Sequence, residues 1–280
     1  MRQCITVDCR LPELPEVEAV RQRLIDERLA GATIVSFAAE RPGTTKPQRP
    51  QAVAKAVRGR VVEGIRRRGK HLFIDLSGGY SIRVHLRMTG NLRIIPDARL
   101  RPATARGWFV LDDGRALILD DPRALGTIHA GRLDEMEAAA AAVGVEPLSD
   151  AFTDDLLLGA TRRSKKPIKT LLMDQRAVAG LGNIYAAEAL FRAGIDPRRE
   201  SRRTSALRLR RLRVEIVRVL ADAVQSTRIA YRAPGRFGEA DSFPLLVYDR
   251  EGEKCGNCGR IIRRIPQGGR STYFCPHCQR

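Results

Sequence analysis

Four of the six cysteines form two Cys-x-x-Cys pairs near the C-terminal end, and they are the residues of this chain with the clearest chemistry. Cys255 pairs with Cys258 and Cys275 with Cys278, and 16 residues separate the two pairs. This spacing is typical of a zinc ribbon or finger, in which four thiolates complete the tetrahedral coordination of one ion. The sequence therefore predicts one structural zinc. His277, in the spacer of the second pair, is a less suitable ligand.

A second candidate for chemistry is the acidic, proline-containing segment Leu11–Glu18. Pro12 and Pro15 each fix φ and lack an N–H, so the segment should be extended until Pro15 enters the first turn of a helix. Carboxylates such as Glu13 and Glu16 are favoured near a helix N-terminus by the helix dipole. Taken alone, these residues predict a helix entry.

Basic side chains give the chain a formal charge of +18 and a pI near 10.6. This charge indicates a polyanionic partner, and nucleic acid is favoured over a membrane because the sequence has no long apolar span or basic amphipathic helix. Arginine outnumbers lysine 43 to 7, so part of the basicity could reflect a coding preference. The few lysines are therefore informative, and four of them are Lys70, Lys165, Lys166 and Lys169.

The first ten residues contain the other two cysteines, Cys4 and Cys9. They lack an apolar core of signal-peptide length, and the cysteine spacing favours metal binding over a disulfide framework. We expect a cytoplasmic protein that acts on the chromosome.

The elements that must position these residues change character along the chain. A helix is expected over Pro15–Leu29, closed by Gly31, because apolar residues recur there at helical spacing. Short alternating runs then predict a β-sandwich. These runs are Thr33–Ala38, Val61–Ile65, His71–Leu76, Ser81–Met88, Asn91–Ile95, Trp108–Leu111 and Ala116–Leu119.

Beyond about residue 133 the pattern becomes helical, and the expected fold class is α+β with several domains. We expect a β-sandwich domain over residues 12–132, a helical domain over 133–245 and a zinc finger over 246–280. Ile229–Ser242 is predicted to be a flexible loop. The helical segments are Glu137–Val143, Thr153–Gly159, Ile168–Asp174, Asn183–Ala193 and Ser205–Thr227.

Five motifs in the same order resemble the formamidopyrimidine-DNA glycosylase and endonuclease VIII family, more closely its first branch. They are the segment after Leu11, Arg66–Lys70, His85–Gly90 with Asp121–Gly126, the turn Gly180–Ala186, and the cysteine module. The resemblance implies a helix-two-turn-helix in the helical domain and a zinc-finger hairpin at the end.

In this family the proline after the initiator Met is the catalytic residue, which implies that Pro12 is the nucleophile. An α-amine is less basic than a lysine amine by about two pKa units, so more of it is free to attack a sugar C1′. The resemblance also implies that Glu13 is a general acid or base, Lys70 lies at the lesion sugar and Arg270 assists the second elimination.

The same resemblance implies a set of residues that contact DNA. Met88, Arg123 and Leu125 would fill the space left by an extruded nucleotide. Leu125 stands where an aromatic residue is common, and Arg87 where glycine is common. Phosphate or lesion contacts would come from Lys165, Lys169 and Asn183.

The expected function is that of a monomeric glycosylase and AP lyase, which removes 8-oxoguanine or formamidopyrimidine bases from damaged duplex DNA and cleaves the strand by β,δ-elimination. Residues 1–11 acylate Pro12 in the printed sequence, so we expect the active chain to begin at Pro12. Three alternatives remain: an endonuclease VIII-type enzyme for oxidised pyrimidines, a non-catalytic lesion-binding relative, and a zinc-ribbon regulator that binds DNA.

Overall fold

The computed structural model describes residues 12–231 and 243–280, which form two compact units. The first unit contains Pro12, Val20–Arg67 and His71–Ala139. The second contains Glu13–Ala19, Arg68–Lys70 and the described part of 140–280. Residues 1–11, which precede the expected start of the active chain at Pro12, lie outside the described residues, as does most of the predicted loop 229–242.

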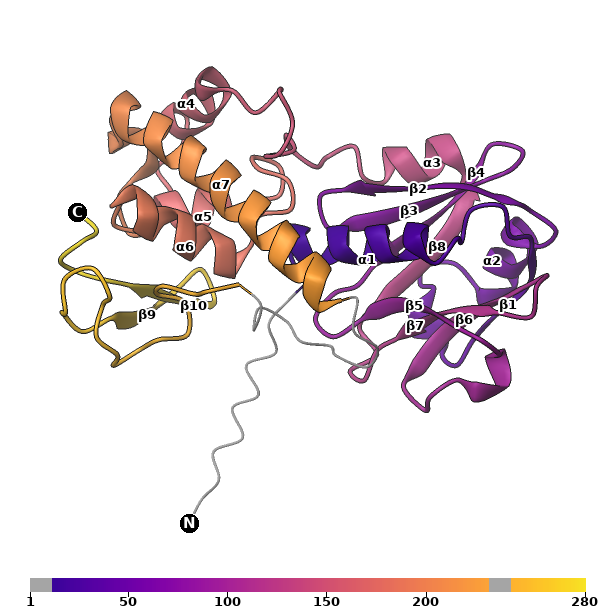
Figure 1. Ribbon diagram of the computed structural model, residues 1–280. Coiled ribbons are helices and arrows are strands. Elements are labelled where there is room, and N and C mark those ends of the chain that lie inside the picture. The colour runs from indigo at the N-terminus through magenta and orange to yellow at the C-terminus, as the bar shows by residue number, and fades with distance from the viewer. Residues whose placement is uncertain (1–11, 232–242) are drawn as a thin grey trace, which may run out of the picture. The chain divides into compact units, whose positions relative to one another are not determined.

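The first unit is built on two four-stranded sheets, with strand orders β2-β3-β4-β8 and β1-β6-β7-β5 (Figure 1). One sheet comprises β2 (Val62–Arg68), β3 (His71–Leu76), β4 (Tyr80–His85) and β8 (Thr127–Arg132). The other comprises β1 (Ile34–Ala39), β6 (Ala105–Leu111), β7 (Ala116–Asp120) and β5 (Asn91–Ile95). Two short helices accompany them, α2 (Pro50–Val57) and α3 (Leu133–Ala138).

The sheets face each other across a buried apolar layer, as predicted for a β-sandwich. A Cβ on Gly107 of β6 would lie 2.9 Å from Ile128 Cδ1 of β8, so the two sheets touch there. In β4, Ile82 and Val84 are fully buried while the intervening Arg83 is not, which is the alternation expected of a half-buried strand. The α+β fold class predicted from the sequence is confirmed.

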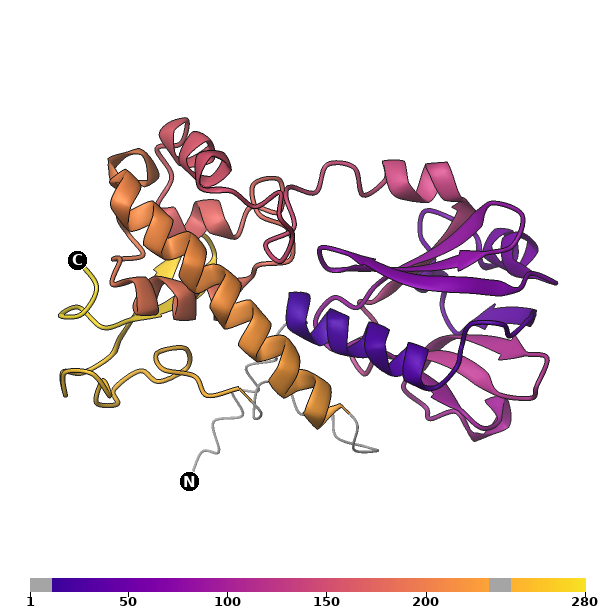
Figure 2. The ribbon, with the colours of Figure 1, turned by 45° about the horizontal axis from the view of Figure 1, so that its top comes forward.

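Several boundaries of the predicted strands and helices differ from those of the structure. Two of these differences follow from residues of the first unit with positive φ. The run that begins at Ser81 ends at His85 rather than Met88, because Arg87 adopts φ 59° in a turn. The first helix, α1 (Leu14–Asp26), is the indigo helix of Figure 2. It ends before Arg28, whose φ of 55° breaks the helix, so Gly31 is not its cap.

The second unit is mainly helical, with one continuous buried cluster drawn from its helices and its cysteine module. Its helices are α4 (Asp154–Arg162), α5 (Ile168–Leu172), α6 (Asn183–Ala193) and α7 (Ala206–Ala230). α6 has the predicted bounds. The alanine-rich segment Glu137–Val143 was predicted to be a helix, which is wrong, because α3 ends at Ala138 and the chain then turns.

The cysteine module ends in the hairpin of β9 (Arg263–Gln267) and β10 (Arg270–Phe274). Gly268 and Gly269 join the strands with φ of 58° and 74°, the left-handed values required of both residues in a type I′ turn. Among the described residues, no helix is long and apolar enough to cross a membrane.

Candidate active site and zinc centre

Glu13 lies at the N-terminus of α6, although about 170 residues separate them in sequence. Its Oε1 accepts a hydrogen bond of 2.9 Å from Ile184 N–H, and its Oε2 a weaker one of 3.5 Å from Tyr185 N–H. The side chain is 1% exposed. The helix dipole and these two N–H groups stabilise a buried carboxylate, so Glu13 is held as an oriented acid or base.

Glu16, one turn further along α1, is a second buried carboxyl group beside Glu13. Its Oε2 accepts a 2.8 Å hydrogen bond from Glu13 N–H, and its Oε1 accepts one of 2.6 Å from the Tyr185 hydroxyl. Burial raises the pKa of Glu16 to about 7, and the nearby Glu13 charge adds to the rise, whereas the Tyr185 hydrogen bond opposes it. Near neutral pH Glu16 is therefore partly protonated.

Lys70 reaches the same place from the turn that follows β2. If Gly182 carried a Cβ, that atom would lie 2.4 Å from Glu13 Oε1 and 2.6 Å from Lys70 Nζ. The Glu13 carboxylate and the Lys70 amine therefore both lie against Gly182. Burial lowers the pKa of Lys70, while the Glu13 charge raises it and the Arg270 charge lowers it. The structure thus brings a carboxylate and an amine of reduced basicity together at the start of α6.

A carboxylate that the sequence analysis did not single out fixes this turn. Arg68 forms an ion pair of 3.3 Å with Glu146 Oε1, and Gly69 N–H donates to the same oxygen at 2.5 Å. Arg68 Nη2 also donates to the carbonyls of Val143 at 2.8 Å and Gly144 at 2.6 Å. These contacts hold the backbone from which Lys70 projects.

Lys169 is buried between α6 and the hairpin, with 1% of its surface exposed. Its ammonium donates to Asn183 Oδ1 at 2.6 Å, to Thr272 Oγ1 at 2.7 Å and to the Ser271 carbonyl at 3.2 Å, which uses all three N–H donors. Burial lowers its pKa to about 7, the Glu13 charge opposes this, and the Arg270 charge adds to it. In this arrangement Lys169 and Asn183 link the helix to the hairpin.

Arg270 is the first residue of β10 and directly follows the glycine turn of the hairpin. Its side chain is exposed, and its charge lowers the pKa of both Lys70 and Lys169. Lys165 is also exposed, in the segment before α5. Both cations are therefore available to phosphate.

The four cysteine sulfurs are arranged for one tetrahedral ion. All four Sγ atoms lie within 4.8 Å of one another, with Cys255 to Cys278 at 3.9 Å and Cys258 to Cys275 at 3.5 Å. Zinc–sulfur bonds of about 2.3 Å in a tetrahedron place sulfurs just under about 4 Å apart, so the residues fit zinc. The predicted structural zinc and its finger are confirmed, and His277 is not a member of the cluster.

Met88, Arg123 and Leu125 belong to the first unit and are carried by two irregular segments. Met88 lies in the turn between β4 and β5, and the other two lie in the loop between β7 and β8. Arg123 and Leu125 are exposed, and Met88 is half-buried. Both segments are tied to one buried residue, Asp121.

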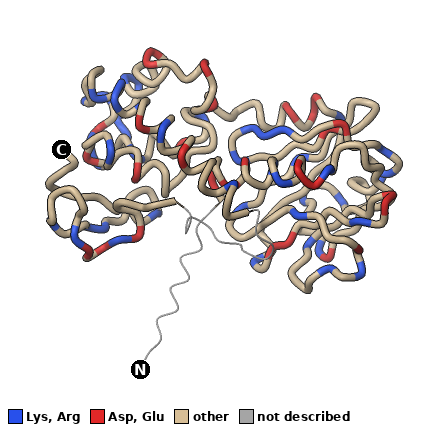
Figure 3. The backbone as a smooth tube through the Cα atoms, in the orientation of Figure 1, with Lys and Arg blue, Asp and Glu red and all other residues tan. Residues whose placement is uncertain are grey.

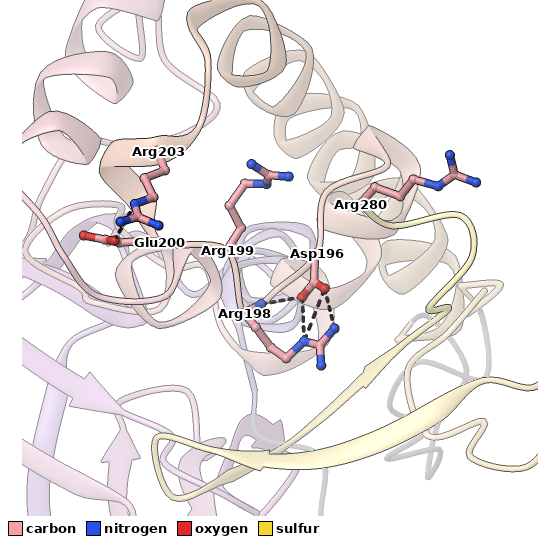
Figure 4. A pocket seen from close by; sticks show the side chains of 6 residues that line it. All are labelled: Asp196, Arg198, Arg199, Glu200, Arg203 and Arg280. Carbon is pink, nitrogen blue, oxygen red and sulfur yellow. Dashed lines mark hydrogen bonds and ion pairs between the residues drawn. The ribbon is translucent and has the colours of Figure 1, made fainter.

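An arginine-lined pocket of the second unit lies outside the Glu13 and Lys70 cluster (Figure 4). Two of its arginines are neutralised, because Arg198 pairs with Asp196 at 2.6 Å and Arg203 with Glu200 at 3.1 Å. Lys and Arg are distributed along the backbone of both units, with Asp and Glu among them (Figure 3).

Of the predicted catalytic residues, the structure brings Glu13, Lys70 and Arg270 into electrostatic contact within the second unit. Pro12 directly precedes Glu13 and is half-buried. The sequence analysis missed Glu146, and it named Glu16 only as a carboxylate at a helix entry. The Glu13 contacts depend on chain segments far apart in sequence, and no local pattern could have revealed them.

Comparison with known families covers most of the chain. A model of the formamidopyrimidine-DNA glycosylase N-terminal domain matches residues 11–128, and a model of the same enzyme's helix-two-turn-helix (H2TH) domain matches residues 143–233. A model of the zinc finger found in FPG and IleRS matches residues 252–280.

Relatives and solved structures agree with these matches. Formamidopyrimidine-DNA glycosylases of Xanthomonas axonopodis pv. citri and Stenotrophomonas maltophilia are each 40% identical over 96% of this chain and 100% of their own. Lactococcus lactis FPG (MutM), in complex with FAPY-dG containing DNA, is 33% identical with a TM-score of 0.87, over 96% of this chain and 100% of its own. MutM from Thermus thermophilus is 37% identical with a TM-score of 0.83, over 96% of this chain and 98% of its own.

Proposed function

Since this chain belongs to the formamidopyrimidine-DNA glycosylase family and is a DNA glycosylase, we propose that it excises oxidised purines from duplex DNA and then cleaves the strand through a Schiff base at Pro12. The observation that carries this proposal is the meeting of the Glu13 carboxylate and the Lys70 amine beside Gly182. A zinc-ribbon regulator would have no use for such a pair, because binding DNA requires no buried acid beside a half-buried amine.

The first step is attack by the Pro12 nitrogen lone pair on C1′ of the damaged nucleoside. The base leaves with the electrons of its glycosidic bond, and the C1′–O4′ bond opens as a proton is delivered to O4′. The amine proton is lost and an iminium ion forms. Glu13 directly follows Pro12 and is oriented by α6, so we propose that its carboxylate accepts the amine proton and delivers it to O4′.

The iminium ion then acts as an electron sink for strand cleavage. Loss of the C2′ proton expels the 3′ phosphate, and a second elimination expels the 5′ phosphate. Arg270 is exposed and its charge acts on Lys70, so its guanidinium is suited to stabilise the phosphate that leaves second. Lys70 would donate a hydrogen bond at the lesion sugar, and its lowered pKa makes it a better proton donor than an ordinary lysine.

This chemistry requires a free amine at Pro12, because an acylated proline nitrogen is an amide with no nucleophilic lone pair. We therefore propose that the active form begins at Pro12. Initiation at the position of Leu11, with removal of the initiator Met, would produce it, and so would proteolysis after Leu11.

Borohydride trapping tests the proposal with two versions of the chain, one that starts at Met1 and one at Met followed by Pro12. Each is incubated with duplex that contains an abasic site, 8-oxoguanine or an oxidised pyrimidine. Only the second version should form a covalent adduct at Pro12, with 8-oxoguanine preferred over the pyrimidine. If the intact long version, verified by mass, is trapped equally well, another amine is the nucleophile.

If neither version is trapped but both bind lesion duplex, the chain is a lesion-binding relative without lyase chemistry. We also propose that the enzyme acts as a monomer on the bacterial chromosome, since its relatives are bacterial repair enzymes. Light scattering of the free protein and of its complex with duplex would measure the stoichiometry.

A further inference from the structure

Two segments of the first unit carry the residues expected to enter the duplex, and both are bound to one buried carboxylate. The turn 86–90 carries Met88, and the loop 121–126 carries Arg123 and Leu125. We propose that Asp121 is a positioning residue that fixes these two segments in one arrangement, so that their side chains can replace an extruded nucleotide. This inference rests on the proposed function, because it concerns how the same enzyme opens the duplex.

The carboxylate of Asp121 is 0% exposed and accepts hydrogen bonds on both oxygens. Its Oδ2 accepts from the backbone N–H groups of Leu125 and Gly126, each at 2.7 Å. Its Oδ1 accepts from the Thr89 hydroxyl and, at 3.3 Å, from Arg123 N–H. One side chain therefore holds its own loop and the neighbouring turn together.

Thr89 makes the link between the segments direct. Its Oγ1 donates to Asp121 and accepts from Arg123 N–H at 3.3 Å, so this N–H is shared between Thr89 and Asp121. A buried carboxylate without such donors would be costly, and this one has four. Asp121 keeps all four hydrogen bonds only while the turn 86–90 and the loop 121–126 hold their present positions relative to each other.

Both segments contain a residue in a conformation that needs external support. Arg87 has φ 59° and Ala124 has φ 54°, and the left-handed region is unfavourable for a non-glycine residue because its Cβ crowds the backbone. Such conformations persist only where the surrounding contacts over-determine them. The hydrogen bonds of Asp121 flank Ala124 on both sides, at Arg123 and Leu125.

A second clamp holds the loop from its other side. Arg106 is buried, and its Nε donates to the Asp121 carbonyl at 2.8 Å while its Nη2 donates to the Pro122 carbonyl at 3.2 Å. The start of the loop is thus fixed through both its side chain and its backbone. Leu125 is nevertheless 42% exposed, so an apolar side chain is presented to solvent from a rigid support.

A rigid support matters because extruding a nucleotide breaks base stacking and pairing. An inserted apolar side chain offsets this loss best when it is already ordered before it binds DNA. Asp121→Asn keeps the volume but replaces an acceptor oxygen by an NH2 group that faces backbone N–H donors. The segments should then lose their fixed arrangement, and base extrusion should suffer while the chemistry at C1′ does not.

The test compares two substrates: 8-oxoguanine in duplex, which must be extruded, and a single-stranded oligonucleotide with an abasic site, which leaves no void to fill. For Asp121→Asn, single-turnover excision should fall by about tenfold or more, while abasic cleavage stays within about twofold. Leu125→Ala should show the same split, and the double variant should lose little more than either single variant.

Asp120→Asn is the matched control, since this neighbouring buried carboxylate binds Arg93 at 2.9 Å and Thr104, two residues that lie outside both segments. It should leave the ratio of the two activities unchanged. Thr89→Val serves as a second variant that cuts only the link between segments, and it should shift the ratio in the same direction as Asp121→Asn.

Equal losses on both substrates, or additive losses with Leu125→Ala, would overturn the positioning role. Failure of the proposed function would look different, because the parent protein would then cleave neither substrate.

Discussion

The Tyr185 hydroxyl donates a hydrogen bond of 2.6 Å to Glu16 Oε1, and both side chains are buried in the second unit. Burial raises the pKa of both groups, to about 7 for Glu16. Protonation of Glu16 would leave Glu13 as the sole negative charge of this pair at the start of α6. The two carboxyl groups therefore differ in role: Glu13 is oriented by hydrogen bonds, whereas Glu16 titrates near neutral pH.

This separation predicts a pH dependence of stability. The Glu16 pKa rises from 4.5 in the unfolded chain to about 7 in the folded protein, so the folded protein holds a proton that the unfolded chain has released. The contribution of this Glu16 proton to the free energy of unfolding is full below pH 4.5 and is lost as the pH rises through about 7. Its slope should approach about 1.4 kcal/mol per pH unit in that interval.

Glu16→Gln should remove the titration, so the free energy of unfolding measured by urea between about pH 5 and 8 should decline less steeply than in the parent. Glu63→Gln, on an exposed position of β2, is the control and should follow the parent curve. Identical curves for the parent and Glu16→Gln would show that Glu16 titrates at an ordinary pH.

The zinc prediction concerns folding of the cysteine module. Cys255 and Cys275 belong to the same buried cluster as α6 and α7, so loss of the ion should disturb the hairpin that carries Arg270. We expect one zinc per chain by metal analysis, and Cys258→Ser should lower both zinc content and DNA affinity. In the version that starts at Met1, the double change Cys4→Ser, Cys9→Ser should alter neither zinc content nor DNA affinity. A zinc content near zero with DNA binding intact would remove the assignment.

Arg270→Ala should affect the second elimination more than the attack by Pro12. The residue is exposed at the hairpin, and its charge reaches Lys70, so its removal takes a cation away from the leaving phosphate. Gel analysis should show accumulation of the β-elimination product, while borohydride trapping on an abasic site changes less. Arg260→Ala, an exposed arginine between the cysteine pairs, is the control. Equal effects of the two substitutions would make Arg270 an ordinary surface cation.

Binding should depend on salt through phosphate neutralisation. A footprint of about six phosphates implies a slope of about −5 in a plot of log affinity against log salt. Lys165→Ala should reduce this slope by about one, because Lys165 is exposed before α5. Lys55→Ala, exposed on α2, should not change it. A nearly flat dependence would mean that the arginine excess reflects coding preference.

Local pattern predicted the bounds of some elements. α6 was placed from Asn183 to Ala193 because its apolar residues recur with helical period, and in the structure the helix ends there before Gly194, whose φ is 70°. β3 and β5 also have the predicted bounds. In each case the residues that define the element are neighbours in sequence.

The missed elements lack such a signal. β8 has only Ile128 and Ala130 on its buried face, and it became a strand because it pairs with β4. α2 is a single short helix with two fully buried residues, Val53 and Val57. Both elements form because of their tertiary packing, and the spacing of their apolar residues did not predict them.

The candidate site divides in the same way. The cysteine cluster was predictable because its ligands follow a fixed spacing. The contact of Glu13 with Ile184 N–H and the bridge from Asp121 to Thr89 depend on how distant segments pack. Their chemistry became visible only through atomic distances.

The tightest of these packed positions is Gly182, which gives the sharpest prediction. Its Cα lies so close to the Glu13 carboxylate and the Lys70 amine that a methyl group would overlap both, at 2.4 Å from Glu13 Oε1 and 2.6 Å from Lys70 Nζ. Gly182→Ala must therefore push the two side chains apart. A displacement of about 1 Å at a catalytic group costs on the order of a hundredfold in rate.

We expect Gly182→Ala to lower single-turnover cleavage of an abasic site by about a hundredfold, while lesion-duplex affinity falls far less, because the residues exposed to phosphate are unchanged. Gly64→Ala in β2 is the matched control, since its added Cβ would meet nothing within 4 Å, and its activity should equal that of the parent. The thermal midpoint of each variant separates loss of geometry from loss of fold. If Gly182→Ala folds and cleaves like the parent, the meeting of Glu13 and Lys70 at this point is not the catalytic arrangement.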